Sequence, residues 1–291
     1  MKIKASRKDK GFQLASTLLV TLLAISIIIP FMNIIAKAFS GYNAVVAGEV
    51  GLLPVDFHWS SMIYVLTNRQ FTTSFLVSAQ VTLMGTFLSL FASGISAYAL
   101  SKKRLMGRSF FIALFVFTMM FSGGMIPNYM LMKNLGLLNS VWSLFLPGAI
   151  SVYNMLILKS NFEGVPEALE ESATLDGASN MTIFLRIYLP VSLPSLAAVS
   201  LFLAVGYWNE YWSALLYITK NQYKPLQLYM LDIIQNVMDP LNSVDSGTDT
   251  RYAPESVRAA TIIASTVPIL LIYPFLQRYF VKGVLVGSVK E

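Results

Sequence analysis

The sequence predicts an all-α integral membrane protein with six transmembrane helices, and three observations support this prediction. Of its 291 residues, 55% are hydrophobic and only 12% are charged, which is about half the charged fraction of a soluble domain. The apolar residues gather in long runs that contain no Asp, Glu, Lys or Arg. The basic residues stand at the ends of those runs, as the positive-inside rule expects of a membrane protein.

Six such runs are long enough, or nearly long enough, to cross about 30 Å of hydrocarbon, which takes roughly 20 helical residues. Helices are expected because unpaired backbone groups are too costly in lipid, and because the runs are too long and continuous for barrel strands. The predicted spans cover about residues 11–36, 71–101, 109–132, 134–158, 187–216 and 259–280 of a single transmembrane domain, residues 1–291.

Other features predict breaks and connections between the spans. Ser122-Gly123-Gly124, followed by Pro127, should break or kink the third span near its outer end. Residues 37–70 and 217–258 are predicted external segments. An amphipathic helix is expected within the second external segment, over residues 225–237.

Lysine and arginine predict the orientation of the chain. The basic residues cluster before the first span, in the loop after the second span and in the tail: Lys2, Lys4, Arg7, Lys8, Lys10, Lys102, Lys103, Arg104, Arg108, Arg278, Lys282 and Lys290. Both termini, and the loop over 160–189, are therefore expected in the cytoplasm. The basic start also resembles a cleavable signal peptide, but its apolar run is longer than usual and contains Pro30, which favours a membrane anchor.

Composition argues against several function classes. The chain has no cysteine, so neither a disulfide framework nor a thiolate metal site is expected. His58 is the single histidine, which leaves no partner for a His-based metal site. The net charge of +6 lies at the ends of apolar runs rather than along one face, and this disfavours nucleic-acid binding.

A polar stretch between the fourth and fifth spans, EESATLDGASNMTIFLRIYLP (170–190), predicts two short helices joined by a turn. Pro166 fits the first turn of a helix, and Gly177 can take the left-handed conformation that ends one. Ser179 or Asn180 can cap the second helix. Three acids near the first helix start suit its positive end: Glu167, Glu170 and Glu171. From these residues alone, a solvated connector and a docking element stay equally open.

Within this stretch, Glu171-Ser172-Ala173, then Gly177, then Ile187 and Leu189-Pro190 match the spacing E-A-A-x(3)-G-x(9)-I-x-L-P. The chain thereby resembles the permease subunits of bacterial ATP-binding-cassette (ABC) importers, with Ser172 in place of the first alanine. FSGGMIPNYMLMKNLGLLNS (121–140) and YWNEYW (207–212) are similar to the carbohydrate-uptake, maltose-permease-like branch and to its oligosaccharide subgroup.

This resemblance implies a type I ABC importer permease fold, with a cytoplasmic coupling helix between spans four and five. It implies oligosaccharide import across the bacterial cytoplasmic membrane, together with a second homologous permease, two ABC ATPases and an extracytoplasmic sugar-binding protein. The subgroup includes carriers of acidic and of neutral oligosaccharides. The residues assigned to ATPase docking are Glu170, Glu171, Ser172, Ala173, Asp176 and Gly177.

The energy source is expected outside this chain. No G-x-x-x-x-G-K-[ST] phosphate loop occurs, so ATP and magnesium are expected on the partner ATPase, and this chain is expected to be a non-catalytic subunit without its own cofactor. An ion-coupled secondary transporter is the alternative, but the six uncharged runs lack the ionisable residues that such transporters place in their spans. The nearest candidate, Glu210, lies toward the outer end of the fifth span. Nothing supports an intramembrane enzyme, since paired intramembrane acids are missing.

Aromatic and amide side chains in spans four and five are candidates for the sugar path, because ligand pockets combine apolar walls with a few polar groups. The candidates are Tyr153, Asn154, Tyr207, Trp208, Asn209 and Glu210. An interfacial aromatic belt is the favoured alternative explanation for the Tyr and Trp residues. A helix–helix hydrogen bond would likewise explain Asn154.

Overall fold

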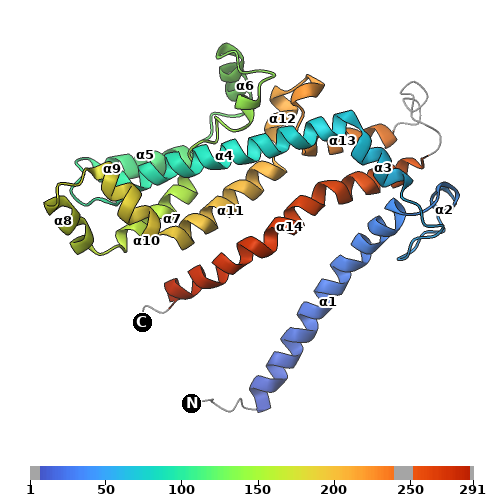
Figure 1. Cartoon of the computed structure of the whole chain (residues 1–291), viewed down its shortest axis with the longest axis horizontal. Coiled ribbons are helices and arrows are strands. Elements are labelled where there is room, and N and C mark those ends of the chain that lie inside the picture. Colours follow the sequence, from blue (N-terminus) through green and yellow to red (C-terminus); the bar gives the residue numbers. More distant parts are fainter. Residues whose placement is uncertain (1–6, 239–251, 289–291) are drawn as a thin grey trace. The chain divides into compact units, whose positions relative to one another are not determined.

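The computed structural model describes residues 7–238 and 252–288 (Figure 1). Within these ranges all regular secondary structure is helical, which confirms the predicted all-α class. The elements are α1 (Arg7–Ala38), α2 (Tyr42–Val46), α3 (Ser60–Thr67), α4 (Arg69–Ser101), α5 (Arg108–Met120), α6 (Met125–Asn134), η1 (Val141–Leu144), α7 (Val152–Glu163), α8 (Glu167–Leu175), α9 (Asn180–Ile183), η2 (Phe184–Tyr188), α10 (Leu189–Val191), α11 (Leu193–Asn209), α12 (Trp212–Tyr217), η3 (Asn221–Tyr223), α13 (Leu226–Met238) and α14 (Pro254–Ser288).

The described chain divides into two compact units, each built from two stretches of sequence. The first takes the chain up to Asn68 together with Met230–Thr266. Its small core includes Ala36, Val45 and Ala253. The Asn33 amide donates hydrogen bonds to the carbonyls of Val50 and Gly51 (3.1 and 2.7 Å), which ties the segment after α2 back to the long helix α1.

The second unit takes Arg69–Tyr229 and the chain from Val267 onward. Helix α4 packs against both α7 and α11 (Figure 1). Small residues permit this close approach, as is common between membrane helices: a Cβ added at Gly85 would lie 2.9 Å from the Tyr207 ring. The core between these helices is built largely from Tyr98, Met155, Leu158, Phe162, Phe184 and Tyr188.

Two described helices are long and apolar enough to cross a membrane by length and composition, over Gly11–Ala38 and Arg69–Ser101. Two further helix pairs meet the same criteria only when each pair is taken together. Arg108–Met120 and Met125–Asn134 are bent by 107°, and Asn180–Val191 and Leu193–Asn209 by 85°. The sixth predicted span lies within α14.

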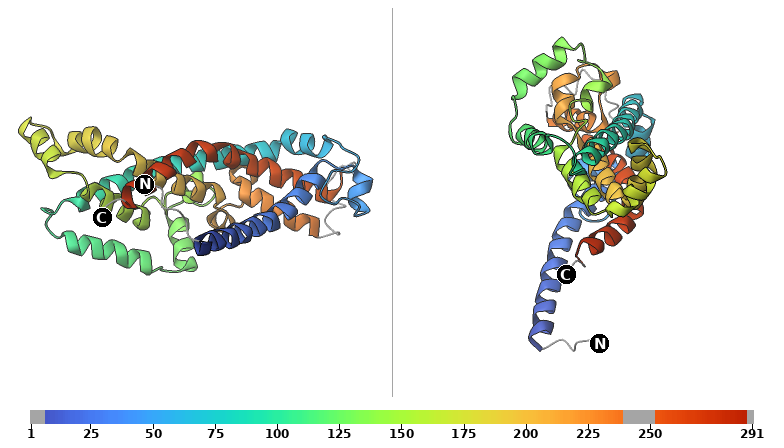
Figure 2. Two further views of the ribbon diagram at one scale, coloured as in Figure 1. Left: turned by 90° about the horizontal axis from the view of Figure 1, so that it is seen from below. Right: turned by 90° about the vertical axis from the view of Figure 1, so that its left-hand side faces the viewer.

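The predicted break in the third span is confirmed. α5 ends at Met120 and α6 begins at Met125, and Figure 2 shows the two helices nearly perpendicular to each other. Gly124 has φ 94°, which is a backbone conformation that glycine adopts without strain. The helix expected over 225–237 is also present, as α13; residues 239–251 of the second external segment lie outside the described residues.

The prediction that 134–158 forms one spanning helix is wrong. The chain between α6 and α7 is irregular apart from the 3₁₀ turn η1, and α7 begins only at Val152. The Ser151 hydroxyl accepts a hydrogen bond from the Asn154 N–H, which caps a new helix start. Pro147 and Gly148 stand between the two helical pieces and oppose a continuous helix. The lack of charged residues over 134–158 therefore indicated an apolar segment, but it did not indicate an unbroken helix.

Candidate functional site

The helix and turn predicted between residues 166 and 190 are present. Helix α8 begins after Pro166 and is closed by Gly177, whose φ is +80°. The N–H groups of Gly177 and Ala178 donate to the carbonyls of Thr174 and Ala173 (3.0 and 2.9 Å). This pair of hydrogen bonds is the Schellman motif that ends helices at a left-handed glycine.

The second helix starts at the predicted cap. The Ser179 hydroxyl accepts a hydrogen bond from the Thr182 N–H. From there α9 runs into the π-helical turn η2 and then into α10. Because these elements continue directly toward α11, the loop and the following apolar helix form one connected piece of chain.

Most of the predicted docking residues lie at the surface of α8 and its turn. Glu171, Ser172, Asp176 and Gly177 are exposed, and Ala173 is half-buried against the core. Leu175, at the end of α8, is 89% exposed. An exposed leucine beside exposed acids is a surface that a protein partner can cover.

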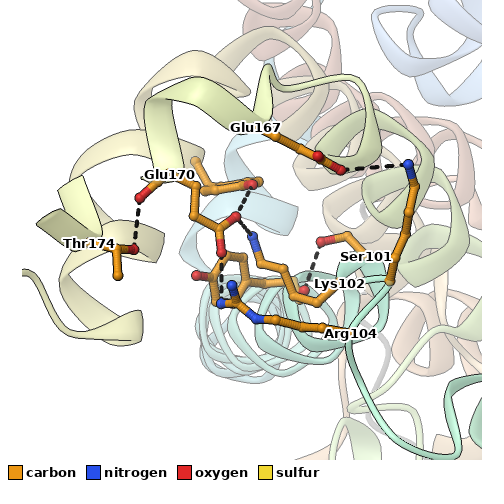
Figure 3. A network of polar contacts seen from close by, with 9 residues as sticks. Ser101, Lys102, Arg104, Glu167, Glu170 and Thr174 are labelled. Atoms are coloured by element: carbon orange, nitrogen blue, oxygen red, sulfur yellow. Dashed lines mark hydrogen bonds and ion pairs between the residues drawn. The ribbon is translucent and has the colours of Figure 1, made fainter. Parts of the chain in front are cut away.

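Glu170 differs from the other predicted docking residues, because its side chain points inward (Figure 3). Its Oε1 accepts a hydrogen bond from the Arg104 guanidinium at 2.8 Å. Its Oε2 accepts from the Tyr188 hydroxyl at 2.8 Å and pairs with the Lys102 ammonium. With its side chain only 9% exposed, Glu170 lies beneath the exposed face of α8 rather than on it.

Lys102 is enclosed by aromatic rings as well as by the carboxylate. Its Nζ lies 4.2 Å from the ring centroid of Tyr98 and 3.8 Å from that of Tyr188. Ring faces attract cations, so the ammonium exchanges water for a carboxylate and two π surfaces. We call Glu170, Lys102, Arg104 and Tyr188 the ionic hub.

The charge state of the hub follows from its contacts. Burial by itself raises the pKa of the Glu170 carboxyl, but the hydrogen bonds from Lys102 and Tyr188 and the charges of Lys102 and Arg104 outweigh it. The pKa of Glu170 therefore lies below its usual value, and the carboxylate is ionised at neutral pH.

A second ionic contact lies beside the hub. The Arg108 side chain donates from Nε to the Leu100 carbonyl (2.8 Å) and pairs with Glu163 near the end of α7. Lys159 also pairs with Glu163, at 2.9 Å. Together with the hub, this contact attaches the connection between α4 and α5 to both α7 and α8. In the sequence, Lys102, Arg104 and Arg108 indicated only the topology of the chain.

A cavity of about 320 Å³ lies between α7, α11 and the irregular segment before α7. Its lining includes Ser143, Gly148, Asn154, Tyr207, Glu210 and Ser213. Three of the residues predicted for the sugar path are thus brought together, namely Asn154, Tyr207 and Glu210.

The other three path residues do not line this cavity. Trp208 is 8% exposed and packs edge-on against Phe75, with ring centroids 5.8 Å apart. The Asn209 amide donates to the Val205 carbonyl of its own helix (2.9 Å). Tyr153 is largely exposed. Which helix face each of these residues occupies depends on tertiary packing, which their aromatic or amide character does not specify.

The polar groups that line the cavity differ in how many hydrogen-bond partners they have. The Tyr207 hydroxyl lies 2.7 Å from the Ser89 hydroxyl and 3.2 Å from the Gly148 carbonyl. One Glu210 oxygen accepts the Ser213 N–H at 2.8 Å. The Asn154 Oδ1 is buried and has no hydrogen-bond partner among the described residues. Among all the residues that the structure describes, no group of three or more His, Asp or Glu side chains is arranged to hold a metal ion.

Comparison with known proteins decides the family. The family model described as "Binding-protein-dependent transport system inner membrane component" matches residues 94–286. The chain belongs to this family of membrane permeases.

Individual relatives are similar in sequence to this permease over nearly its whole length. The polygalacturonan/rhamnogalacturonan transport system permease protein YtcP of Bacillus subtilis (strain 168) is 40% identical, over 97% of this chain and 99% of its own. Protein LplC of the same organism is also 40% identical, over 90% and 89%. A crystal structure of a bacterial ABC transporter involved in import of the acidic polysaccharide alginate contains a chain with 33% identity and a TM-score of 0.88, covering 94% of this chain and 98% of that chain.

These similarities confirm several predictions. The permease has the type I importer fold, is a non-catalytic membrane subunit and acts with a substrate-binding protein. Membership of this family also rules out the ion-coupled secondary transporter. The number of spans and the orientation of the termini stay predictions.

Proposed function

We propose that this permease is one of two homologous membrane subunits of an ATP-driven importer that carries oligosaccharides across the bacterial cytoplasmic membrane. The observation that favours this function most is the surface of α8, where Glu171 is exposed on a helix closed by Gly177. The names of the relatives, which specify polygalacturonan, rhamnogalacturonan and alginate, support a saccharide cargo.

The docking face for the partner ATPase consists of Glu171, Ser172, Leu175, Asp176 and Gly177, with Ala173 packed beneath it. Two ABC ATPases bind ATP and magnesium, and this chain binds neither. The acids of the face suit a basic cleft on the ATPase, and Leu175 supplies apolar area that contact would remove from water.

Movement of α8 reaches the membrane helices through the ionic hub. Glu170 joins α8 to Lys102 and Arg104, which directly follow α4, and to Tyr188 in η2. Because η2 leads through α10 into α11, a displacement of α8 is transmitted to both α4 and α11. This rigid attachment supports alternating access driven by the ATPases, in which each ligand biases one of two conformations.

We propose six spans with both termini in the cytoplasm. In the second unit, the basic residues 102–108 contact α8 and the end of α7, so the docking face and the most basic internal loop share one end of the unit. The positive-inside rule assigns that end to the cytoplasm. The segments 37–70 and 217–258 then face the extracytoplasmic binding protein.

The test is reconstitution of the complete importer in liposomes, with uptake and ATP hydrolysis measured across a panel of oligosaccharides. Glu171→Ala and Leu175→Ser should each lower uptake about tenfold, the loss expected from a contact worth about 1.4 kcal/mol. Saccharide binding to the isolated binding protein should not change. Glu49→Ala, an exposed acid in the external segment, is the control and should transport normally.

Two outcomes would count against the proposal in different ways. Import of no saccharide by the assembled wild-type complex would remove the carbohydrate assignment. Full uptake by both α8 variants would remove the docking assignment and leave the carbohydrate assignment in place.

A further inference from the structure

The cavity beside Asn154 lies at the depth of the middle of α4. The 33 residues of α4 extend over about 50 Å at 1.5 Å per residue, and Gly85 is the central one. A Cβ at Gly85 would lie 2.9 Å from the Tyr207 ring and 3.0 Å from the Phe145 Cβ. Because Tyr207 lines the cavity, the cavity lies beside the middle of α4 rather than at either of its ends.

Part of the cavity wall is irregular backbone, which includes Pro147 and Gly148. The chain between η1 and α7 is not helical, and non-helical backbone within a membrane persists only where protein covers it or where it lines a polar cavity. Tyr207 and Ser89 reach the Gly148 carbonyl. The remaining wall borders open space of about 320 Å³, which falls at the lower end of small-molecule sites, roughly 300–1,000 Å³.

Two hydrogen-bond acceptors face this space without full partners. Asn154 is 7% exposed and lines the cavity, and its Oδ1 has no partner in the described part of the chain. A buried acceptor without a donor is costly, so its presence calls for a ligand or an ordered water. Glu210 uses one oxygen on the Ser213 N–H, and its other oxygen makes no hydrogen bond within the described ranges.

The lining contains no cation to balance these acceptors. Among its described residues Glu210 is the single charged one. Hydroxyl groups can donate to an amide oxygen and to a carboxylate. A carboxylate on the ligand would instead meet a like charge and an unpaired acceptor in a region of low dielectric, where repulsion is strong.

We propose that this cavity is a saccharide subsite that accepts hydrogen bonds from the hydroxyl groups of one sugar unit and excludes that unit's carboxylate. The subsite rests on the oligosaccharide-import function proposed above and specifies which part of the cargo this subunit contacts. An acidic oligosaccharide passes with its carboxylates directed away from Asn154 and Glu210, or with a neutral unit in the cavity.

The experiment compares a neutral and a uronate oligosaccharide of equal length in the reconstituted importer. Asn154→Leu should lower the maximal uptake rate of both cargoes severalfold. Glu210→Gln should raise the ratio of uronate to neutral uptake severalfold. Asn161→Leu changes an exposed amide two turns away on the same helix, outside the cavity lining, and should alter neither rate.

A stability measurement separates a ligand contact from a structural role. Removing an unpaired buried acceptor should leave the thermal unfolding temperature of the Asn154→Leu complex equal to or above that of wild type, while uptake falls. A large drop in that temperature, or unchanged rates and ratio in both cavity variants while wild type imports, would overturn the subsite. Absence of any uptake by wild type would instead overturn the import function itself.

Discussion

Among single residues, Glu170 shows how packing can reassign a charge that looks like part of a docking surface. Its neighbour Glu171 is exposed, whereas the Glu170 side chain is 9% exposed and is surrounded by three donors. An ion in such surroundings is stable only while its partners remain. The hub therefore links the local fold of α8 to charges on a different part of the chain.

Replacing the Glu170 charge should destabilise the permease substantially. In Glu170→Gln the Lys102 ammonium, on a side chain that is 13% exposed, loses its counter-charge, and loss of one partner from a buried ion pair costs about 3–5 kcal/mol. The free energy of unfolding of the purified subunit in detergent measures this loss. Glu167→Gln is the matched control, because the Lys103–Glu167 pair is 3.5 Å apart with side chains 80% and 76% exposed; an equal loss in both variants would contradict the role of the hub.

The hub also predicts a dependence of stability on pH. Because the pKa of the folded Glu170 carboxyl lies below the ordinary 4.5, its stabilisation is present above that pH and is lost as the pH falls through the folded pKa. The difference in unfolding free energy between wild type and Glu170→Gln should stay constant between about pH 7 and pH 5 and shrink on further acidification. A difference that grows below pH 4.5 would show that another group dominates.

At the scale of elements, α8 depends on a single backbone conformation at its end. Gly177 has φ +80°, and a Cβ built there meets no atom within 4 Å. An added side chain therefore adds backbone strain without a clash. The strain acts on the turn that directs the chain from the docking face into α9, so function should respond more than stability.

Gly177→Ala should lower the free energy of unfolding by about 1 kcal/mol, the cost of left-handed backbone for a residue with a Cβ. Coupled uptake should fall further than this small loss explains, because the turn orients α8 toward the ATPase. Uptake and unfolding measured on the same preparation test this. Gly51→Ala, where the Cβ also meets nothing and φ is not in the left-handed range, should behave like wild type.

Local signals predicted some elements well and others poorly. The glycine at 177, the Ser179 cap and the Gly124 break are set by neighbouring residues, and the structure has all three. The run 134–158 was misjudged because an apolar sequence satisfies both a lipid-facing helix and an irregular segment buried by other helices. Only the packing of α4 and α11 around Phe145 and Gly148 selects the irregular segment.

For the whole molecule, the absence of native cysteine makes the proposed topology directly testable. Single-cysteine variants Leu175→Cys and Glu49→Cys replace exposed residues that are assigned to opposite sides of the membrane. A membrane-impermeant thiol reagent should label Glu49→Cys in intact cells and Leu175→Cys only after the membrane is opened. Labelling of both positions in intact cells would contradict the orientation.

The energy source predicts how transport responds to ion gradients. Uptake by the reconstituted complex should require ATP inside the vesicle, where the ATPases face, and should persist when a protonophore or sodium ionophore abolishes the gradients. Radiolabelled saccharide uptake measures both conditions. Uptake driven by an ion gradient without ATP would contradict the assignment to ABC importers.

The sequence by itself determined the membrane class, the all-α fold and the helix–turn–helix of the proposed coupling loop, because composition, caps and glycine turns act among adjacent residues. Only the tertiary structure decided which polar groups are buried together. Glu170 meets Lys102 and Arg104 across separations of 68 and 66 residues, and Asn154 shares a cavity with Glu210, which directly follows α11. Such contacts depend on how the helices pack. Burial removes water from charges and amides, so their hydrogen-bond and ionic partners must come from residues that are distant in the sequence.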